Sequence, residues 1–173
     1  MISTIRESQP SGPPGALPAT EATRACQHAA LRWLPMTDQQ SFDDARRGFI
    51  ADLPTGAITR ANGTPVWNLA AYGFLADEQP PDTVHPGLWR HARVNMITGL
   101  FKVCERVYQV RGIDISNMTI LEGDSGLILI DPLVSTEVAR AALALYRQHR
   151  SDQAHKPVVA VVYSHSHSDH FGG

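Results

Sequence analysis

Two short apolar segments flank one amphipathic segment near the end of this 173-residue chain, and this order limits the folds open to it. Residues 127–130 (Leu-Ile-Leu-Ile) and 158–162 (Val-Val-Ala-Val-Val) are apolar at every position, which is typical of strands covered on both faces. A strand, helix, strand order with so long a crossover favours parallel pairing of the strands, as in an α/β fold. Between them Ser135 can cap a helix to about Gln148, with an inward face of Val138, Ala142, Leu145 and Tyr146.

A run of histidines follows directly after the second apolar segment. Residues 164–173 read Ser-His-Ser-His-Ser-Asp-His-Phe-Gly-Gly, so three imidazoles and one carboxylate lie within six consecutive residues. Imidazole nitrogens suit zinc, and a carboxylate can ligate a second metal. Functional groups in open α/β sheets gather at the carboxyl ends of the strands, where this run lies. A His-rich surface loop is the alternative, but the spacing favours a metal site made by His165, His167, Asp169 and His170.

The chain before these segments divides into a tail and a leader. Residues 1–20, rich in Ser, Pro and Gly, are predicted to form a flexible tail. Residues 21–101 are predicted to form a mainly helical leader, and residues 102–173 the domain that carries the metal motif.

Individual elements can be predicted within these parts. In the leader, helices are expected over 21–34 and 88–101, and over a segment of helical spacing from 42 to 53. Thr37 and Gln40 have the spacing of a capping box at the start of that segment. After the leader, strands are expected over 106–110 and 117–122.

Composition argues against several classes of function. A net charge of −2 without a Lys/Arg cluster argues against a nucleic-acid partner. No apolar run approaches the roughly 18–20 residues that span a bilayer, so no transmembrane segment is expected. The start of the chain lacks the apolar core of a secretory signal, which favours a cytoplasmic location.

The run His165-x-His167-x-Asp169-His170 resembles the signature of the metallo-β-lactamase superfamily, whose fold is an αββα sandwich. In that family the first two histidines bind one metal, and the aspartate and last histidine bind the other. The resemblance therefore implies two zinc ions, with His165 and His167 on the first and Asp169 and His170 on the second. It also implies a catalytic role for Asp169. Asp131, at the end of the preceding apolar segment, resembles an earlier acidic position of the family that braces the metal loop.

Further segments resemble the class III alkyl sulfatases, which hydrolyse dodecyl sulfate and similar esters to alcohol and sulfate. This resemblance covers most of the chain from about Phe42, and it implies a zinc-dependent hydrolase of small alkyl sulfates that is a homodimer at full length. Ordinary β-lactamases and glyoxalase II enzymes lack a leader of this size. The similar segments are Phe42-Asp43-Asp44-Ala45-Arg46-Arg47-Gly48-Phe49, Val66-Trp67-Asn68, Tyr108-Gln109-Val110-Arg111-Gly112, Ser116-Asn117-Met118-Thr119 and Ile130-Asp131-Pro132-Leu133.

The chain departs from the family in its length, because family members continue for several hundred residues past the motif. It is therefore expected to be an N-terminal fragment, inactive alone, whose strands leave an unpaired edge and an uncovered apolar face. Other readings stay open. The chain could derive from a sibling hydrolase such as a lactonase, thioesterase or aryl sulfatase, from a non-catalytic metal-binding module, or from an inert relic of a split gene.

Overall fold

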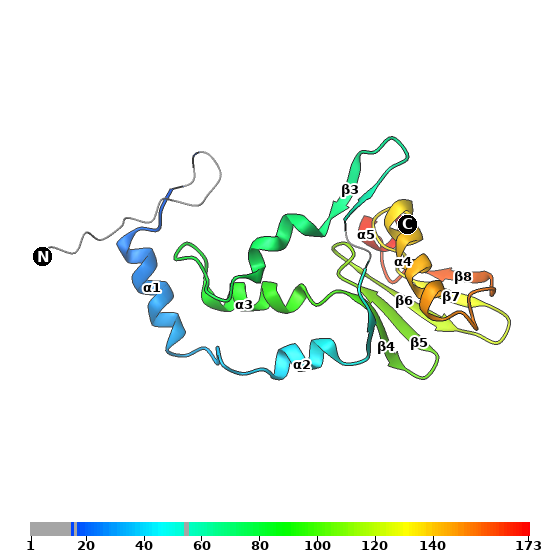
Figure 1. Ribbon diagram of the computed structural model, residues 1–173, viewed down its shortest axis with the longest axis horizontal. Coiled ribbons are helices and arrows are strands. Elements are labelled where there is room, and N and C mark those ends of the chain that lie inside the picture. The colour runs from blue at the N-terminus through cyan, green and yellow to red at the C-terminus, as the bar shows by residue number, and fades with distance from the viewer. Residues whose placement is uncertain (1–14, 16, 54–55) are drawn as a thin grey trace, which may run out of the picture.

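The computed structural model describes residues 15, 17–53 and 56–173 (Figure 1). Most of the predicted tail, residues 1–14 and 16, lies outside the described residues, and residues 17–20 lead into the first helix without regular structure. The leader contains four helical segments: α1 (Glu21–Leu31), α2 (Gln40–Arg46), the 3-10 helix η1 (Leu69–Ala76) and α3 (Pro86–Asn95). It also contains three short strands, β1 (Phe49–Ala51), β2 (Ala57–Thr59) and β3 (Pro65–Asn68).

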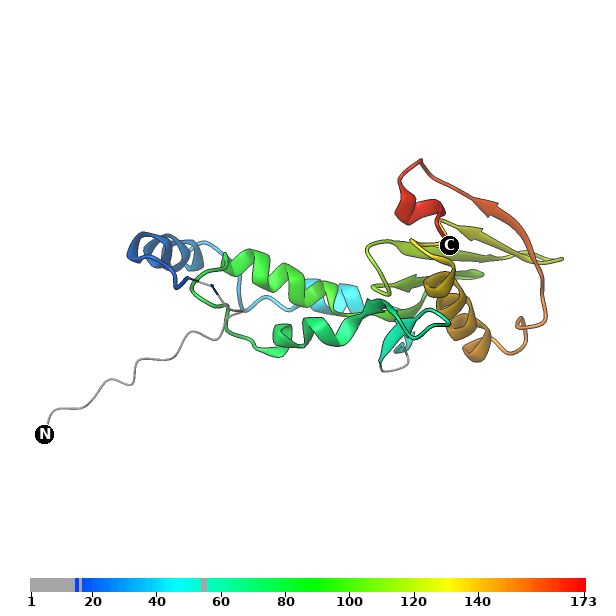
Figure 2. The same cartoon turned by 90° about the horizontal axis from the view of Figure 1, so that it is seen from above.

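Strand β1 of the leader joins five later strands in a six-stranded sheet, in the order β1-β4-β5-β6-β7-β8. Neighbouring strands are antiparallel except for β7 and β8, which are parallel as the sequence predicted. Helices α1, α2 and α3 lie at one end of the elongated molecule and the sheet with α4 at the other (Figures 1 and 2). The remaining elements are β4 (Gly99–Cys104), β5 (Val107–Arg111), β6 (Asn117–Glu122), β7 (Leu127–Ile130), α4 (Thr136–His149), β8 (Val158–Val162) and α5 (Ser168–Phe171).

Two segments of the leader that the sequence predicts as helices are only partly helical. The expected helix over 42–53 is wrong beyond Arg46, because Phe49–Ala51 form strand β1. The expected helix over 88–101 ends at Asn95, since Gly99 has a φ of 128° and begins strand β4. Strands β1 and β4 pair with each other across about fifty residues, a contact that local spacing does not encode. The division at 101–102 stays a prediction, and β4 runs across it.

The capping box predicted from Thr37 and Gln40 is also wrong. Helix α2 begins after Gln39, which makes no side-chain cap. The Gln40 amide instead donates to Oδ1 of Asp38 at 2.9 Å, so an aspartate two residues before it takes the role assigned to the threonine.

The core lies between helix α4 and one face of the sheet. Val138, Ala142, Leu145 and Tyr146 are the buried residues of α4, which confirms the predicted inward face. They pack with alternate residues of the sheet, such as Tyr108 and Val110 of β5 and Met118 and Ile120 of β6. The hairpin of β2 and β3 lies against α4 and adds partly buried Ile58, Val66 and Trp67 to the same cluster. This packing fixes α4 and the loop that precedes it on the sheet.

Strand β8 is not buried on both faces as the sequence predicted. Val159, Val161 and Val162 are 54%, 43% and 47% exposed. The reason is that β8 is the last strand in the order of the sheet, and the described residues leave these side chains uncovered. The uncovered apolar face expected for this chain is therefore present in the described structure.

The N-terminal cap of α4 gives a first stability prediction. The Ser135 hydroxyl accepts from the Val138 amide at 3.4 Å, as expected from the sequence. Replacing Ser135 with Ala is expected to lower the free energy of unfolding by about 1 kcal/mol, because that amide loses its partner. Urea denaturation would measure the change. Thr136→Ala is the control, since the Thr136 hydroxyl is not a cap, and equal losses in both variants would contradict the assignment.

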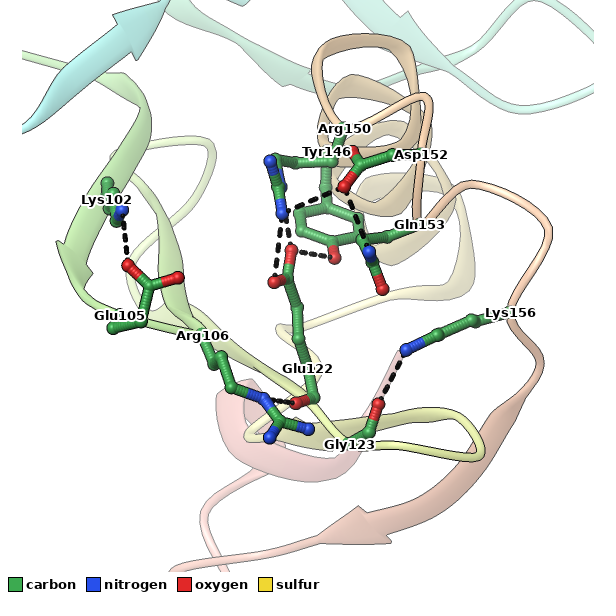
Figure 3. Close-up of polar contacts among 10 residues, drawn as sticks. All are labelled: Lys102, Glu105, Arg106, Glu122, Gly123, Tyr146, Arg150, Asp152, Gln153 and Lys156. Atoms are coloured by element: carbon green, nitrogen blue, oxygen red, sulfur yellow. Dashed lines mark hydrogen bonds and ion pairs between the residues drawn. The ribbon is translucent and has the colours of Figure 1, made fainter.

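A buried ion pair joins the far end of α4 to the end of β6 (Figure 3). Glu122 is 7% exposed, and its carboxylate accepts from the Tyr146 hydroxyl at 2.7 Å. It also accepts from Nε and Nη2 of Arg150 at 2.8 and 3.1 Å, in a two-pronged contact. The Arg150 guanidinium lies 5.1 Å from the ring centroid of Tyr108, so the cation is covered by an aromatic face. The network thus ties α4 to the sheet.

This network predicts a pH dependence of stability. Burial by itself raises the pKa of Glu122, but the hydrogen bonds from Arg150 and Tyr146 outweigh it and hold the pKa below the ordinary 4.5. A carboxyl with a lowered folded-state pKa stabilises the fold above its unfolded value, and this contribution is lost as the pH falls through the folded value. The unfolding free-energy difference between wild type and Glu122→Gln is therefore expected to shrink below pH 4.5. Urea titrations from pH 7 to pH 3 would contradict this if the difference stayed constant.

Over residues 15, 17–53 and 56–173, every helix is too short or too polar to span a bilayer.

Candidate metal centre

The histidine run lies where two parallel strands end at the same edge of the sheet. Asp131 directly follows β7, and Ser164 follows β8 with one residue between them. The Ser164 amide donates to Oδ1 of Asp131 at 2.7 Å, and the Ser164 hydroxyl donates to Oδ2 at 2.6 Å. The carboxylate after one strand therefore holds the second residue after the other strand.

His165 and His167 point their ring nitrogens at one another. Nε2 of His165 lies 2.9 Å from Nδ1 of His167, and the rings are nearly perpendicular, with centroids 4.7 Å apart. Both residues are exposed. One intervening residue in a tight loop brings the two donor atoms to the same side, as expected from the sequence.

Asp169 and His170 form a second pair on the short helix α5. Nε2 of His170 lies 3.1 Å from Oδ2 of Asp169, and its Nδ1 lies 2.9 Å from Oδ2 of Asp131. The His170 ring is 4.0 Å from that of His165, centroid to centroid, so the two pairs adjoin. Asp131 thus orients one nitrogen of His170 and leaves the other directed at Asp169.

The environment of Asp131 keeps its carboxylate charged. Burial works against the charge, yet the hydrogen bonds from Ser164 and the contact with His170 outweigh burial and lower the pKa of Asp131 below its ordinary value. A charged carboxylate is the form that accepts both hydrogen bonds from Ser164.

The loop after β7 has an unusual backbone beside these pairs. Asp131 and Leu133 have φ angles of 54° and 75°, in the left-handed region that non-glycine residues seldom adopt. Residues held there are concentrated at functional sites, because the surrounding structure has to enforce them. The loop therefore needs other contacts to keep this shape.

The donor atoms fit zinc in type and spacing. Two nitrogens on one tetrahedral zinc, each about 2.0–2.1 Å from it, lie roughly 3.3 Å apart, close to the separations within both pairs. Within the described residues, however, no three His, Cys, Asp or Glu side chains are grouped so that they could hold one ion. Each pair thus offers two donors toward a metal.

A buried aspartate that sequence reasoning missed lies close to the same loop. Asp114, between β5 and β6, is 6% exposed, and its carboxylate accepts from the Ser116 amide at 2.6 Å and the Val134 amide at 2.9 Å. Burial raises the pKa of Asp114 above its ordinary value, although the hydrogen bonds from the two amides lower it. The charges of Asp169 and His170 act on this pKa in opposite directions. The spacing Asp114-Ile115-Ser116 allows an Asx turn, which is the one sequence signal that could have singled it out.

The described surface has a hollow beside the histidines and another among the leader helices. The first is shallow and is lined by Tyr163, His165, Ser166 and Phe171, and the two aromatic rings meet edge to face, 6.4 Å apart. It therefore offers apolar surface next to a candidate ligand. The larger hollow, about 500 Å³, lies among the leader helices, lined by residues such as His28, Phe42 and Arg93, away from the metal motif.

Comparisons with known proteins match both parts of the chain. Residues 111–173 match the family model described as "Metallo-beta-lactamase superfamily". The chain is 54% identical over 156 residues to an (R)-specific secondary-alkylsulfatase and 51% identical over 159 residues to a linear primary-alkylsulfatase, both of Pseudomonas sp. These matches cover 90% and 91% of the chain but 23% of each relative, so the chain spans about a quarter of their length.

A solved structure is similar over the same extent. The stereoselective inverting sec-alkylsulfatase Pisa1 from Pseudomonas sp. superposes with a TM-score of 0.83 at 55% identity, over 91% of this chain and 24% of that one. Because it spans more than nine tenths of this chain, the match takes in residues of the leader as well as of the sheet.

Proposed function

We propose that the chain forms about a quarter of a zinc-dependent alkyl sulfatase of the metallo-β-lactamase superfamily, whose family model matches residues 111–173. The full-length protein would hydrolyse alkyl sulfate esters to an alcohol and inorganic sulfate. The observation that carries the proposal is the convergence of His165 with His167 and of Asp169 with His170 at the edge where β7 and β8 end.

The four candidate ligands would serve two zinc ions. His165 and His167 would hold one ion, and Asp169 and His170 the other, with further ligands supplied from outside these residues. Zinc, when bound, supplies a Lewis acid and lowers the pKa of a coordinated water to about 7. Asp131 fixes the tautomer and orientation of His170 through Nδ1, because that nitrogen faces the carboxylate at 2.9 Å. Asp169 lies 3.1 Å from Nε2 of His170 and would act in catalysis from the second site.

The substrate class fits the surface beside the motif. An alkyl sulfate has an anionic head and an apolar tail, so it needs positive charge at one point and apolar surface next to it. Tyr163 and Phe171 provide apolar surface adjacent to His165. The high identity to one secondary- and one primary-alkylsulfatase supports the sulfate ester as the group that is cleaved.

The test is turnover by the full-length protein. Purified protein loaded with zinc would be given dodecyl sulfate, octan-2-yl sulfate, an aryl sulfate, a lactone and a thioester, and sulfate release would be measured by ion chromatography. Release from the alkyl sulfates at a rate at least tenfold above the other esters is the expected result. Preferred cleavage of the lactone, the thioester or the aryl sulfate would replace this proposal with a sibling hydrolase. Zinc binding without turnover would replace it with a metal-binding module.

The cytoplasmic location and the homodimer stay predictions. Cell fractionation and sedimentation of the full-length protein would check them.

A further inference from the structure

Asp114 is a buried carboxylate for which the proposed chemistry has no use. It lies in the turn between β5 and β6, at the end of the sheet where β7 and β8 also finish, because Arg111 pairs with Asn117 and Thr119 with Ile130. One oxygen accepts from the Ser116 amide within its own turn at 2.6 Å. The other accepts from the Val134 amide at 2.9 Å, twenty residues further along. Asp114 therefore joins its turn to the loop after β7.

That loop, residues 131–134, is also in contact with the end of the metal motif. A Cβ added to Gly172 would lie 2.2 Å from the carbonyl oxygen of Val134. A Cβ added to Gly173 would lie 1.8 Å from the carbonyl oxygen of Pro132. The chain after α5 thus packs directly on the loop, and only glycine permits this approach. The loop has Asp114 on one side and the segment that follows Asp169 and His170 on the other.

We propose that Asp114 is a positioning residue for the second metal pair, Asp169 and His170. By holding the Val134 amide it fixes the loop that carries Asp131 and supports Gly172 and Gly173. Asp131 in turn orients His170 through the 2.9 Å contact with Nδ1. This inference rests on the proposed function, since it assigns a role toward one of the two zinc ions.

The backbone of the loop explains why such a support is needed. Asp131 and Leu133 both have positive φ, a conformation that is unfavourable for residues other than glycine, so the loop relaxes unless it is held. The Asp131 amide donates to the carbonyl oxygen of Val162 at 2.9 Å, which fixes the start of the loop. The Asp114 carboxylate fixes its end. A shift at Val134 would move Asp131 and, with it, the ring of His170.

The charged groups near Asp114 are consistent with its role as a positioning residue. Burial raises the pKa of Asp114, and the charges of Asp169 and His170 act on it in opposite directions. A divalent ion held by the pair would favour the charged form of Asp114, and the charged form accepts both amides. Metal binding and the Asp114 hydrogen bonds are therefore expected to support each other.

The chain offers a matched control for the test. Glu122 is a buried carboxylate of nearly equal exposure, 7% against 6% for Asp114, at the opposite end of β6. Asp114→Asn and Glu122→Gln each replace a buried carboxylate by its isosteric amide. Both are expected to lower the melting temperature of the metal-free protein, but only the first removes an acceptor from the loop beside the metal pair.

The experiment measures zinc affinity in the full-length protein. Competition with a chromophoric chelator would give the affinity of each site in wild type, Asp114→Asn, Asp114→Ser and Glu122→Gln. In the Asp114 variants, affinity at one site is expected to fall about 10- to 100-fold, as for other residues that orient metal ligands, while the other site changes by less than about twofold. In Glu122→Gln both affinities are expected to stay within about twofold of wild type, whatever the loss of stability.

Unchanged zinc affinities in both Asp114 variants would overturn this inference but not the proposed function. An equal loss of zinc affinity in Glu122→Gln would do the same, because it would show a general effect of stability. A wild-type protein that binds no zinc would overturn the proposed function as well. If the Asp114 variants fail to fold, a measurement on the wild-type protein still tests the inference. Zinc is expected to slow hydrogen exchange of the Val134 amide at least tenfold, and unchanged exchange would also reject the role of Asp114.

Discussion

Replacing Asp169 with Asn in the full-length protein is expected to lower kcat for dodecyl sulfate by about a thousandfold, which corresponds to roughly 4 kcal/mol of transition-state stabilisation. The amide keeps the shape of the side chain but removes the negative charge beside Nε2 of His170. A pair that loses its anionic donor holds a divalent ion more weakly. Initial rates at saturating substrate, together with zinc content, would measure the effect.

The control for this variant is the same substitution at an exposed aspartate. Asp124 contacts Arg106 in a turn at the far end of the sheet, and its side chain is 96% exposed. Asp124→Asn is expected to leave kcat and zinc content unchanged. If Asp169→Asn kept more than a tenth of the wild-type kcat, Asp169 would have no part in the metal chemistry.

Replacing Glu122 with Ala is expected to lower the free energy of unfolding by about 3 kcal/mol, the lower end of the cost of breaking a buried ion pair. The change leaves the Arg150 guanidinium and the Tyr146 hydroxyl without their acceptor (Figure 3). The lower end applies because the Arg150 side chain is 27% exposed and regains some hydration. Denaturant unfolding followed by circular dichroism would give the value.

A second carboxylate in the same region serves as the comparison. Glu105 contacts Lys102 at 2.9 Å, but its side chain is 81% exposed. Exposed pairs contribute little, so Glu105→Ala is expected to leave the stability nearly unchanged. Equal effects at Glu105 and Glu122 would mean that the buried network does not stabilise the fold.

The second half of the chain could largely be predicted from its sequence. Residues 127–162 follow local rules, because each strand is continuous and apolar and the helix between them has both a Ser135 cap and a regular inward face. The candidate metal motif could be recognised for the same reason, since its four proposed ligands lie within six residues, and their binding of metal stays a prediction. A sequence pattern can be recognised when the residues that form it lie close together in the chain.

The errors concern contacts between distant residues. Leu100 falls at helical spacing from Leu88 and Met96, yet it belongs to β4, where its burial depends on pairing with β5 and β1. Asp114 was missed because its partner Val134 contributes only a backbone amide, and amides leave no trace in a sequence. The burial predicted for β8 failed because coverage is a property of neighbouring elements rather than of the strand itself.

Strand β6 separates the two groups of polar contacts described above. Its six residues put roughly 17 Å between the Cα atoms of Asn117 and Glu122. Changes around Glu122, Arg150 and Asp152 are therefore expected to alter heat resistance without reaching the proposed metal site. Under the proposed function, a library aimed at durability belongs at that end of β6, and one aimed at altered metal or substrate preference at the other.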